Sequence, residues 1–556
     1  MVCPGSRSTP LALALARDSR LRVHVRLDER SAAFFALGLS VATFRPVVVC
    51  TTSGTAAVEL HPAVVEAYHS GVPLLVCTAN RPPRLQRVGA PQVIDQTGLY
   101  GSSVVWSAAP GVPDWGGRPA WRSLASRAFA ESLYGQAGRG PVHLDLAFEE
   151  PLVGSPAELP DGRAGERPWH DVKSGRPGHV PGIESLSGSR KRVLVVAGSG
   201  CGSPEAVLAA AEALEAPVLA DPLSGCRLDR RGVVAASDAI LRSDSAAAAL
   251  RPDMAIRLGG LHASKVLSAR LHEWSGAGTR QLLVDSRWRW PDPDRDADSV
   301  VRADPATWCE QVCEILGSSP TVRDRAWADS WSLAESEAQS AIEAWCKAHP
   351  EATEPGVGRA LLGIVPPEST VVVASSMPVR DMEWYAPALD RPPKVVSNRG
   401  ANGIDGVVST ALGVAAAGDG PVVAVVGDLA FLHDLSAWAG ARPQNPGVTV
   451  VVVDNRGGGI FSFLPQRASV DNQVFEQLFG TPQPIGIEQA ARGLGLEVRD
   501  ARTMEDLVKS VRDSVTSGTT SVVRVDVPGR DPNVCHHDEL NAEVARRVTG
   551  ALGLEE

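Results

Sequence analysis

Short apolar runs alternate with helix-length segments along most of the chain. The two most regular runs, 421–426 and 448–453, are unbroken and rich in β-branched residues, which is typical of strands buried on both faces of a parallel sheet. The alternation predicts an α/β protein whose domains are mainly parallel sheets flanked by helices. Further strands are predicted at 21–25, 46–50, 72–78, 142–145, 192–197, 370–374, 394–396 and 520–527, and a long amphipathic helix at 323–349.

The pattern divides the chain into three domains. Residues 1–152 and 321–556 form the first and third, and residues 191–320 form a Rossmann-like central domain with few chemically reactive side chains. The stretch 153–190 is rich in Pro, Gly, Ser and charge, which predicts a linker. Met1–Cys3 lead directly into a polar turn of the kind that follows a strand. We therefore expect the first domain to lack its initial helix and strand, either because the start codon was placed late or because these elements were lost.

Polar clusters follow the two most regular strands. Gly427 and Asp428 follow the first strand, whereas Asn455 and a run of glycines from Gly457 follow the second. Ligands of open α/β sheets bind at the carboxyl ends of strands, and the 27-residue separation of Asp428 from Asn455 suits a crossover between neighbouring strands. Two side-chain oxygens and the Gly457 carbonyl would give Mg²⁺ three ligands and leave positions for a diphosphate. A capped strand end with a glycine-rich loop is the alternative at this point.

Composition narrows the class of protein. The 556 residues are 44% hydrophobic, and the net charge of −10 argues against nucleic acid or an anionic membrane as a general partner. The chain has no apolar run long enough to span a bilayer and no charged-then-apolar leader, so we expect a cytoplasmic protein. The nine cysteines include no four-ligand zinc set and are expected to be reduced. Any anion site must therefore be a local cluster of Arg and Lys.

Seven motifs together resemble those of one enzyme family. They are CPGSR at 3–7, LDER at 27–30, TTSGTA at 51–56, NRP at 80–82, SNRGANGIDG at 397–406, GDL at 427–429 and DNRGGGIF at 454–461. The chain is similar over nearly its whole length to the 2-succinyl-5-enolpyruvyl-6-hydroxy-3-cyclohexene-1-carboxylate synthases (the MenD family) of menaquinone biosynthesis. The resemblance implies a thiamine diphosphate-enzyme fold with pyrimidine-binding, central and diphosphate-binding domains. It also implies active sites between two subunits, hence a homodimer or homotetramer.

The resemblance further implies a transferase reaction and its cofactors. The enzyme would decarboxylate 2-oxoglutarate on thiamine diphosphate and add the resulting succinyl-semialdehyde carbanion to isochorismate by 1,4-addition. Glu29 would be catalytic, exchanging a proton with N1′ of the aminopyrimidine, because the cofactor supplies the carbanion chemistry and the protein positions it. Mg²⁺, with Mn²⁺ possible, would be bound by Asp428, Asn455 and Gly457. The other cofactor contacts would be Ser376, Gly403, Ile404, Gly427 and Leu429, with an ordinary core position as the alternative for Ile404.

The substrates set a requirement for positive charge. They bring four carboxylates, and a bidentate arginine matches a carboxylate in geometry and charge. Four arginines lie on predicted strand-end loops of the first and third domains, although a solvated surface position is the alternative for each one alone. The resemblance adds hydrogen-bonding residues, a lysine of the central domain and an apolar wall. The predicted substrate residues are Ser6, Arg7, Arg81, Gln92, Lys265, Arg380, Arg399, Ile460 and Phe461.

One position departs from the family pattern. Pro91 stands where the family has Asn before the glutamine, which removes one polar substrate contact. Two other functions stay open. One is another thiamine diphosphate-dependent 2-oxoacid decarboxylase, or an acetolactate synthase-like enzyme acting on pyruvate, which would need fewer cations. The other is a truncated inactive homologue.

Overall fold

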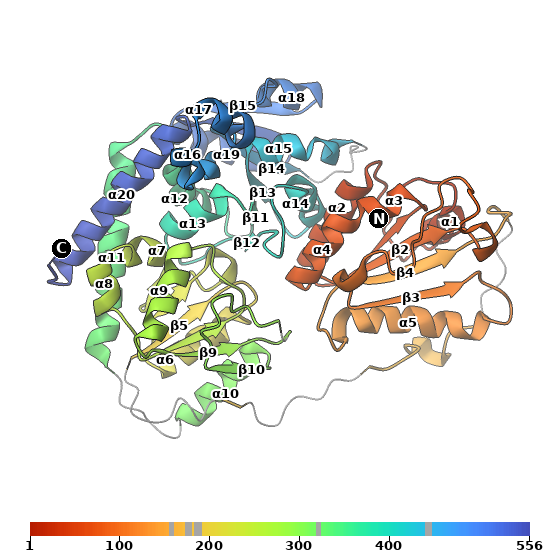
Figure 1. Ribbon diagram of the computed structural model, residues 1–556, viewed down its shortest axis with the longest axis horizontal. Coiled ribbons are helices and arrows are strands. Elements are labelled where there is room, and N and C mark those ends of the chain that lie inside the picture. The colour runs from red at the N-terminus through yellow and green to blue at the C-terminus, as the bar shows by residue number, and fades with distance from the viewer. Residues whose placement is uncertain are drawn as a thin grey trace. The chain divides into compact units, whose positions relative to one another are not determined.

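The fold consists of three parallel sheets flanked by helices, as the sequence predicts (Figure 1). The computed structural model describes residues 1–154, 161–172, 181–182, 192–287, 289–317, 324–439 and 447–555, so most of the predicted linker at 153–190 lies outside the described residues. Contacts within the chain define two compact units. The first unit comprises Met1–Arg176, Asn398–Asp419 and Ala430–Val448, and the second comprises Pro177–Ser397, Gly420–Leu429 and Thr449–Glu556.

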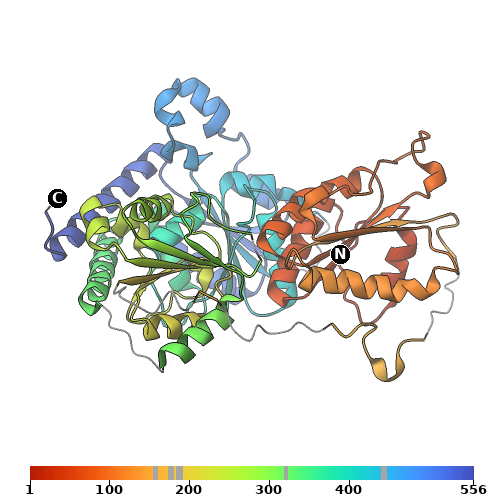
Figure 2. The ribbon, with the colours of Figure 1, turned by 60° about the horizontal axis from the view of Figure 1, so that its bottom comes forward.

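The first unit is built on a four-stranded parallel sheet with the strand order β1-β2-β4-β3. Helix α5 runs along one face of this sheet in both views (Figures 1 and 2). The strands are β1 (Val47–Thr51), β2 (Leu74–Asn80), β3 (Trp106–Gly111) and β4 (Val142–Ala147). The helices are α1 (Thr9–Arg17), α2 (Glu29–Thr43), α3 (Thr55–Glu59), α4 (His61–Ser70), α5 (Arg118–Tyr134) and α14 (Val407–Ala417).

The first three residues of the chain lie beside β1. Val2 forms parallel bridges to both Cys50 and Val25, and the Cys3 N–H donates to the Cys50 carbonyl at 2.9 Å. The expectation that the sheet has no strand before the Ser6 turn is therefore corrected in part, because residues 1–3 occupy a strand position. The strand predicted at 21–25 is reduced to the single bridge at Val25.

Helices α2 and α14 pack with their backbones almost in contact. A Cβ atom on Gly38 of α2 would lie 2.0 Å from the Thr410 carbonyl oxygen, and one on Gly413 of α14 would lie 2.0 Å from the Phe35 carbonyl oxygen. Because real Cβ atoms do not come this close to other atoms, only glycine permits this crossing. The crossing fixes the position of Glu29, the first residue of α2.

The second unit contains two six-stranded sheets, ordered β10-β9-β8-β5-β6-β7 and β12-β11-β13-β14-β16-β15. The strands of the first of these sheets are β5 (Val193–Ala197), β6 (Val218–Ala220), β7 (Val233–Val234), β8 (Met254–Leu258), β9 (Arg280–Val284) and β10 (Ser299–Val301). Those of the second are β11 (Thr370–Val373), β12 (Lys394–Val396), β13 (Val422–Gly427), β14 (Val448–Asp454), β15 (Glu497–Ala501) and β16 (Ser521–Asp526). The two runs from which the sheet was predicted, β13 and β14, are buried neighbours.

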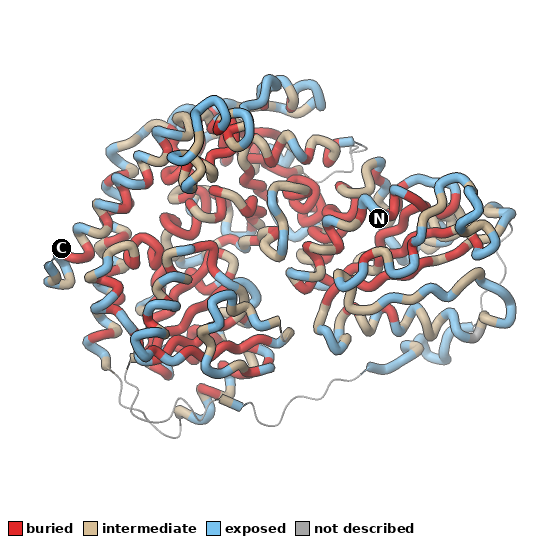
Figure 3. The backbone as a smooth tube through the Cα atoms, in the orientation of Figure 1, coloured by how far each residue is buried: buried red, intermediate tan, exposed pale blue. Residues whose placement is uncertain are grey.

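Helices surround both sheets of the second unit, and the strands of the β5–β10 sheet are largely buried (Figure 3). The predicted amphipathic helix is present as α11, whose Trp327 and Trp331 share a core with Leu540 of α20. Within the described parts of the chain, we find no helix that is long and apolar enough to cross a membrane. The helices are α6 (Pro204–Ala213), α7 (Ser237–Leu241), α8 (Asp244–Ala249), α9 (Lys265–Gly276), α10 (Pro305–Gly317), α11 (Arg325–Ala348), α12 (Glu354–Ile364), α13 (Met377–Tyr385), α16 (Gln466–Ser469), α17 (Asn472–Phe475), α18 (Ile487–Gly493), α19 (Met504–Ser517) and α20 (Arg530–Ala551). Helix α15 (Asp428–His433) begins in this unit and passes into the first unit at Ala430.

Candidate active site

The carboxyl ends of β13 and β14 bring Asp428 and Asn455 to neighbouring positions. The two strands are adjacent in the sheet, which confirms the arrangement expected from the spacing of these residues. Both side chains are buried, and the Asp428 carboxylate accepts a hydrogen bond from the Leu429 N–H at 2.8 Å. Burial, followed by the nearby charge of Asp454, raises the pKa of Asp428 to about 6. Asp428 forms no ion pair with any described residue, so a bound cation would favour its ionised form.

Asn455 presents an amide oxygen that no protein group satisfies. Its Nδ2 donates to Glu354 Oε1 at 2.7 Å, whereas its Oδ1 is buried and has no hydrogen-bond partner among the described residues. A buried, unpaired amide oxygen is destabilising unless something else binds it. Oxygen ligands from an aspartate and an asparagine suit Mg²⁺, so the residues present fit the predicted metal.

Gly457 and Gly427 lie in different surroundings. Gly457 has φ of 139° and a Cβ there would lie 2.0 Å from the Gly480 carbonyl oxygen, so the fold of the loop itself requires glycine. At Gly427, by contrast, a Cβ would meet nothing within 4 Å. Packing against protein therefore does not explain Gly427, and the open space beside Asp428 fits a phosphate group.

Asn455 is held by a buried group of polar side chains that the sequence did not reveal. Glu354 begins α12, and burial together with the charge of Asp381 raises its pKa to about 7. Asp381 in turn accepts a hydrogen bond from His537 Nε2 at 2.7 Å. These residues lie far apart in the sequence, and only the Thr-Glu-Pro start of α12 could have indicated that Glu354 begins a helix.

Glu29 begins α2 but does not cap it. The cap of α2 is Asp28, whose carboxylate accepts from the Ser31 N–H at 2.7 Å. Glu29 is half-buried, and burial, followed by the charges of Asp28 and Glu59, raises its pKa. The side chain is therefore able to hold a proton more readily than an exposed glutamate.

A single buried carboxylate anchors the loop that contains Gly403 and Ile404. Glu66 of α4 accepts hydrogen bonds from the backbone N–H groups of Gly400, Ala401 and Asn402, at 2.8, 2.7 and 3.0 Å. Beyond this anchor Gly403 is exposed and Ile404 is half-buried. Glu66 was not predicted, because the residues that it binds are more than 300 positions away.

Arg7 and Arg81 form a cationic cluster in the first unit. Arg7 is buried and binds the Phe148 carbonyl at 3.1 Å and Glu150 at 3.2 Å, while its Nε has no partner among the described residues. Arg81 donates to the Gln92 carbonyl at 2.8 Å, and its pKa is lowered by burial and then by the charge of Arg7. Two guanidinium groups close enough to repel each other are suited to binding an anion.

The other predicted substrate residues are distributed over both units. In the first unit Ser6 is exposed, Arg399 has no ion pair or hydrogen bond with any described residue, and the amide of Gln92 donates to the Ser53 carbonyl at 2.8 Å. In the second unit Arg380 of α13 donates to the carbonyls of residues 375 and 376, both at 2.8 Å, and so lies beside Ser376. The remaining three are Lys265, exposed at the start of α9, and Ile460 and Phe461, both half-buried after β14.

A second polar network missed by the sequence lies at the carboxyl ends of β2 and β4. Asp145 accepts from Asn80 Nδ2 at 3.0 Å, from Gln96 at 3.3 Å and from Thr97 at 3.2 Å. It lines a cavity of about 450 Å³ together with Arg81. The network therefore fixes the strand end from which Arg81 projects.

Models of two protein domain families match this chain. The thiamine pyrophosphate enzyme N-terminal TPP binding domain matches residues 1–99, and the corresponding C-terminal TPP binding domain matches residues 382–525. The first matched range contains Glu29, and the second contains the predicted metal ligands Asp428 and Asn455. Cofactor-binding domains of this type are therefore found where the geometry places the candidate cofactor residues.

Curated relatives match over nearly the entire chain. A 2-succinyl-5-enolpyruvyl-6-hydroxy-3-cyclohexene-1-carboxylate synthase from Geobacillus kaustophilus (strain HTA426) is 40% identical over 99% of this chain and 96% of its own length. Synthases of the same name from Chloroflexus aurantiacus (strain ATCC 29366 / DSM 635 / J-10-fl) and Myxococcus xanthus (strain DK1622) are each 38% identical, over 97% and 98% of this chain and 92% and 94% of theirs.

A solved structure supports the fold independently. The thiamine diphosphate-dependent 4-hydroxybenzoylformate decarboxylase of Rhodococcus jostii RHA1 superposes with a TM-score of 0.70 over 95% of this chain and 96% of that one. The two sequences are 16% identical, so this likeness concerns the fold alone.

Proposed function

Because this chain belongs to the family of 2-succinyl-5-enolpyruvyl-6-hydroxy-3-cyclohexene-1-carboxylate synthases, we propose that it makes this product from 2-oxoglutarate and isochorismate. 2-Oxoglutarate loses CO₂, and the remaining four-carbon unit is joined to the isochorismate ring by 1,4-addition. The enzyme is then a thiamine diphosphate-dependent transferase of menaquinone biosynthesis. The observation that carries this proposal is the 40% identity to such a synthase over 99% of the chain.

The second unit would hold the diphosphate end of the cofactor. Thiamine diphosphate, when bound, supplies the carbanion chemistry that amino-acid side chains lack. Asp428, Asn455 and the Gly457 carbonyl would bind Mg²⁺, or Mn²⁺ in its place, and the unpartnered Asn455 Oδ1 supports this assignment. The open space at Gly427 would admit a phosphate. Ser376, Gly403, Ile404 and Leu429 would complete the cofactor contacts.

Glu29 would hold and move a proton at N1′ of the aminopyrimidine. A general acid–base group works best when its pKa lies near the working pH, and burial moves the pKa of Glu29 in that direction. Asp28 caps the helix, so a proton on Glu29 does not weaken the first turn of α2.

The cationic residues would bind the substrate carboxylates. Arg7 and Arg81 form one anion site in the first unit, and the family resemblance adds Arg399, Arg380 and Lys265 as further substrate cations. Ser6 and Gln92 would add hydrogen bonds, and Ile460 and Phe461 an apolar wall. Two dicarboxylate substrates need this number of cations, whereas pyruvate needs fewer, which favours 2-oxoglutarate over pyruvate.

We further propose that two copies complete each active site. In the family arrangement, Glu29 of one copy contacts the cofactor held by Asp428 of the other, so the enzyme is a homodimer or homotetramer. We place it in the cytoplasm, since its nine cysteines are all unpaired, as is usual in a reducing compartment.

Substrate feeding tests the function. The full chain is supplied with Mg²⁺, thiamine diphosphate and 2-oxoglutarate, first alone and then with isochorismate, while CO₂ release and isochorismate absorbance are followed. We expect isochorismate to be consumed only when 2-oxoglutarate is present, with one CO₂ released per ring consumed. Faster CO₂ release from pyruvate than from 2-oxoglutarate would support the decarboxylase alternative, and no reaction with either acid would support the inactive homologue.

A further inference from the structure

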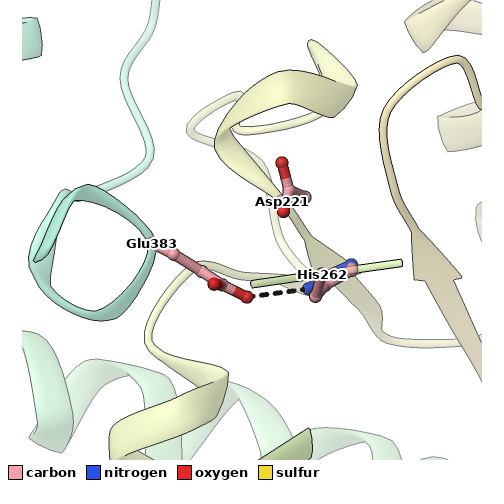
Figure 4. Close-up of side chains that lie close together, drawn as sticks. All are labelled: Asp221, His262 and Glu383. Atoms are coloured by element: carbon pink, nitrogen blue, oxygen red, sulfur yellow. Dashed lines mark ion pairs between the residues drawn. The ribbon is translucent and has the colours of Figure 1, made fainter. Parts of the chain in front are cut away.

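Three buried side chains that the proposed reaction does not use converge in the second unit (Figure 4). Asp221 follows β6, His262 lies in the loop after β8, and Glu383 belongs to α13. Their exposed fractions are 2%, 8% and 1%. One potential ligand atom from each lies within 4.8 Å of the other two. The cluster thus combines one imidazole and two carboxylates in a place from which water is largely excluded.

The hydrogen bond of His262 determines which of its nitrogens faces the cluster. His262 Nε2 lies 3.1 Å from the Ala197 carbonyl oxygen, and a carbonyl only accepts, so Nε2 carries the proton. The other nitrogen, Nδ1, faces Glu383 Oε1. This arrangement is typical of a metal-binding histidine, whose second ring nitrogen is held by a backbone carbonyl.

The contact between His262 and Glu383 requires a positive species. His262 Nδ1 and both carboxylate oxygens of Glu383 are buried and have no hydrogen-bond partner among the described residues. A lone pair on Nδ1 would face the lone pairs of Glu383 Oε1 unless a proton or a metal ion lies between them.

The distance distinguishes a metal ion from a proton. His262 Nδ1 and Glu383 Oε1 are 3.3 Å apart, whereas the protein's own buried His537–Asp381 pair is 2.7 Å apart. Charge-assisted N–H···O bonds are about 2.7–2.9 Å long, so the first pair is too wide for one. Two ligands of a tetrahedral ion with bonds of about 2.0–2.1 Å are separated by roughly 3.3–3.4 Å, which fits.

The nearest arginine does not fill the role of that cation. Arg227 is buried, but its N–H groups donate to five backbone carbonyls, those of Ala220, Ala235, Met382, Glu383 and Ala386. These contacts hold the end of α13 against the β5–β10 sheet. They leave the carboxylates of Asp221 and Glu383 without a donor from Arg227. Arg227 therefore brings positive charge near the cluster but has no N–H group left to lie between His262 and Glu383.

We propose that Asp221, His262 and Glu383 form a second metal site, for which Zn²⁺ is the best-suited ion. This site shares no residue with the predicted Mg²⁺ site. Its nitrogen ligand and its small number of ligands favour zinc, whereas magnesium prefers six oxygens. The ion connects the loops that follow β6 and β8 to α13. Since α13 also contains Arg380 and follows Ser376, the site would fix the helix from which these residues project.

Cobalt replaces zinc in such sites and reports its coordination by absorption. The full chain carrying Cys535→Ser, which removes the exposed thiol, is saturated with Mg²⁺ and thiamine diphosphate and titrated with Co²⁺. We expect intense visible bands of four-coordinate cobalt that saturate at one ion per chain and are abolished by added Zn²⁺. Zn²⁺ should also raise the melting temperature, because it binds the folded state.

Matched variants identify the ligands. Glu383→Gln keeps the shape of the side chain and His262→Gln removes the nitrogen ligand, so both should lose the bands, whereas Asp428→Asn alters only the predicted Mg²⁺ site and should keep them. Bands that persist in Glu383→Gln, or no bands in the parent chain, would overturn the proposal in favour of a shared proton. If His262→Gln does not fold, Glu383→Gln alone decides.

Discussion

Acidic residues on or next to helices take different roles in this protein according to what their oxygens contact. Asp28 and Glu66 accept hydrogen bonds from backbone N–H groups and hold local structure. Glu29 and Glu354, in contrast, begin helices without capping them, and burial raises the pKa of both. Of the neighbouring acids Asp28 and Glu29, the first caps α2, which leaves the second available for the proposed proton transfer.

Glu29→Gln tests the proton-transfer role. Gln has the same shape but cannot exchange a proton, so turnover should fall by roughly 10²–10⁴-fold, the usual contribution of general acid–base catalysis. Thiamine diphosphate binding, measured by fluorescence titration, should change little. The matched control is Asp28→Asn, which alters the adjacent carboxylate but keeps a good helix cap and should stay within severalfold of the parent rate. A Glu29→Gln enzyme working at full speed would refute the assignment.

We expect Glu354 to act on the proposed metal through Asn455. Its Oε1 accepts from Asn455 Nδ2 and so orients Oδ1 for a cation. Glu354→Ala removes this acceptor, and we expect Mg²⁺ affinity to fall about 10–100-fold, as is common when a group supporting a metal ligand is lost. Glu354→Gln retains an acceptor oxygen and should restore most of the affinity, measured as the Mg²⁺ dependence of cofactor binding. Equal loss in both variants would mean that Glu354 serves only the fold.

At the level of secondary-structure elements, the crossing of α2 and α14 links Glu29 to the loop that contains Gly403 and Ile404. Gly38 and Gly413 allow the two backbones to touch, and Glu66 fastens the loop that precedes α14. Glu29, the proposed catalytic acid, and the loop proposed to contact the cofactor are therefore held together within the first unit. The packing of glycine backbones, rather than the size of the apolar side chains, sets the distance between these helices.

Gly413→Ala should disturb this crossing. The added methyl group would lie 2.0 Å from the Phe35 carbonyl oxygen, and separating the helices should cost about 1–3 kcal/mol of stability, measured by urea unfolding. Gly363→Ala, near the end of α12, is the matched control, since its methyl group would meet nothing within 4 Å. That variant should be neutral or slightly stabilising, because alanine favours a helix. Equal behaviour of the two variants would show that the α2–α14 contact tolerates separation.

Asp434, which binds Ser409 of α14, makes the free energy of unfolding depend on pH. It accepts from the Ser409 N–H at 2.7 Å and from Ser409 Oγ at 3.0 Å, and burial raises its pKa to about 6. The folded state therefore binds a proton that the unfolded state releases, so this group favours folding more strongly as pH falls through 6 towards 4. Its full contribution is about 3 kcal/mol. We expect Asp434→Asn to remove this component. When the pH is lowered from 7 to 5, the unfolding free energy of the variant should therefore rise less, or fall more, than that of the parent chain.

For the whole molecule, the sequence predicted the features that depend on local patterns. The runs at β13 and β14 and the 27-residue spacing of Asp428 and Asn455 indicated adjacent strand ends, because a parallel crossover has few solutions. The contacts of Glu354 and Glu66 could not be predicted in this way. The partner of each of these buried carboxylates lies far away in the sequence. No periodicity or motif in the chain indicates which distant segments will be in contact.

The proposed assembly places the two halves of each active site on different copies of the chain, and mixing variants tests this directly. Glu29→Gln and Asp428→Asn should each be inactive alone, the first for lack of a proton-transfer group and the second for lack of a metal ligand. After joint refolding or subunit exchange, half of the dimers are mixed, and one of the two sites in each mixed dimer combines an intact Glu29 with an intact Asp428. Activity should therefore return to about one quarter of the parent value. If one chain supplied both residues, every site in the mixture would carry a substitution and no activity would return, which would refute the shared site while leaving the proposed reaction untouched.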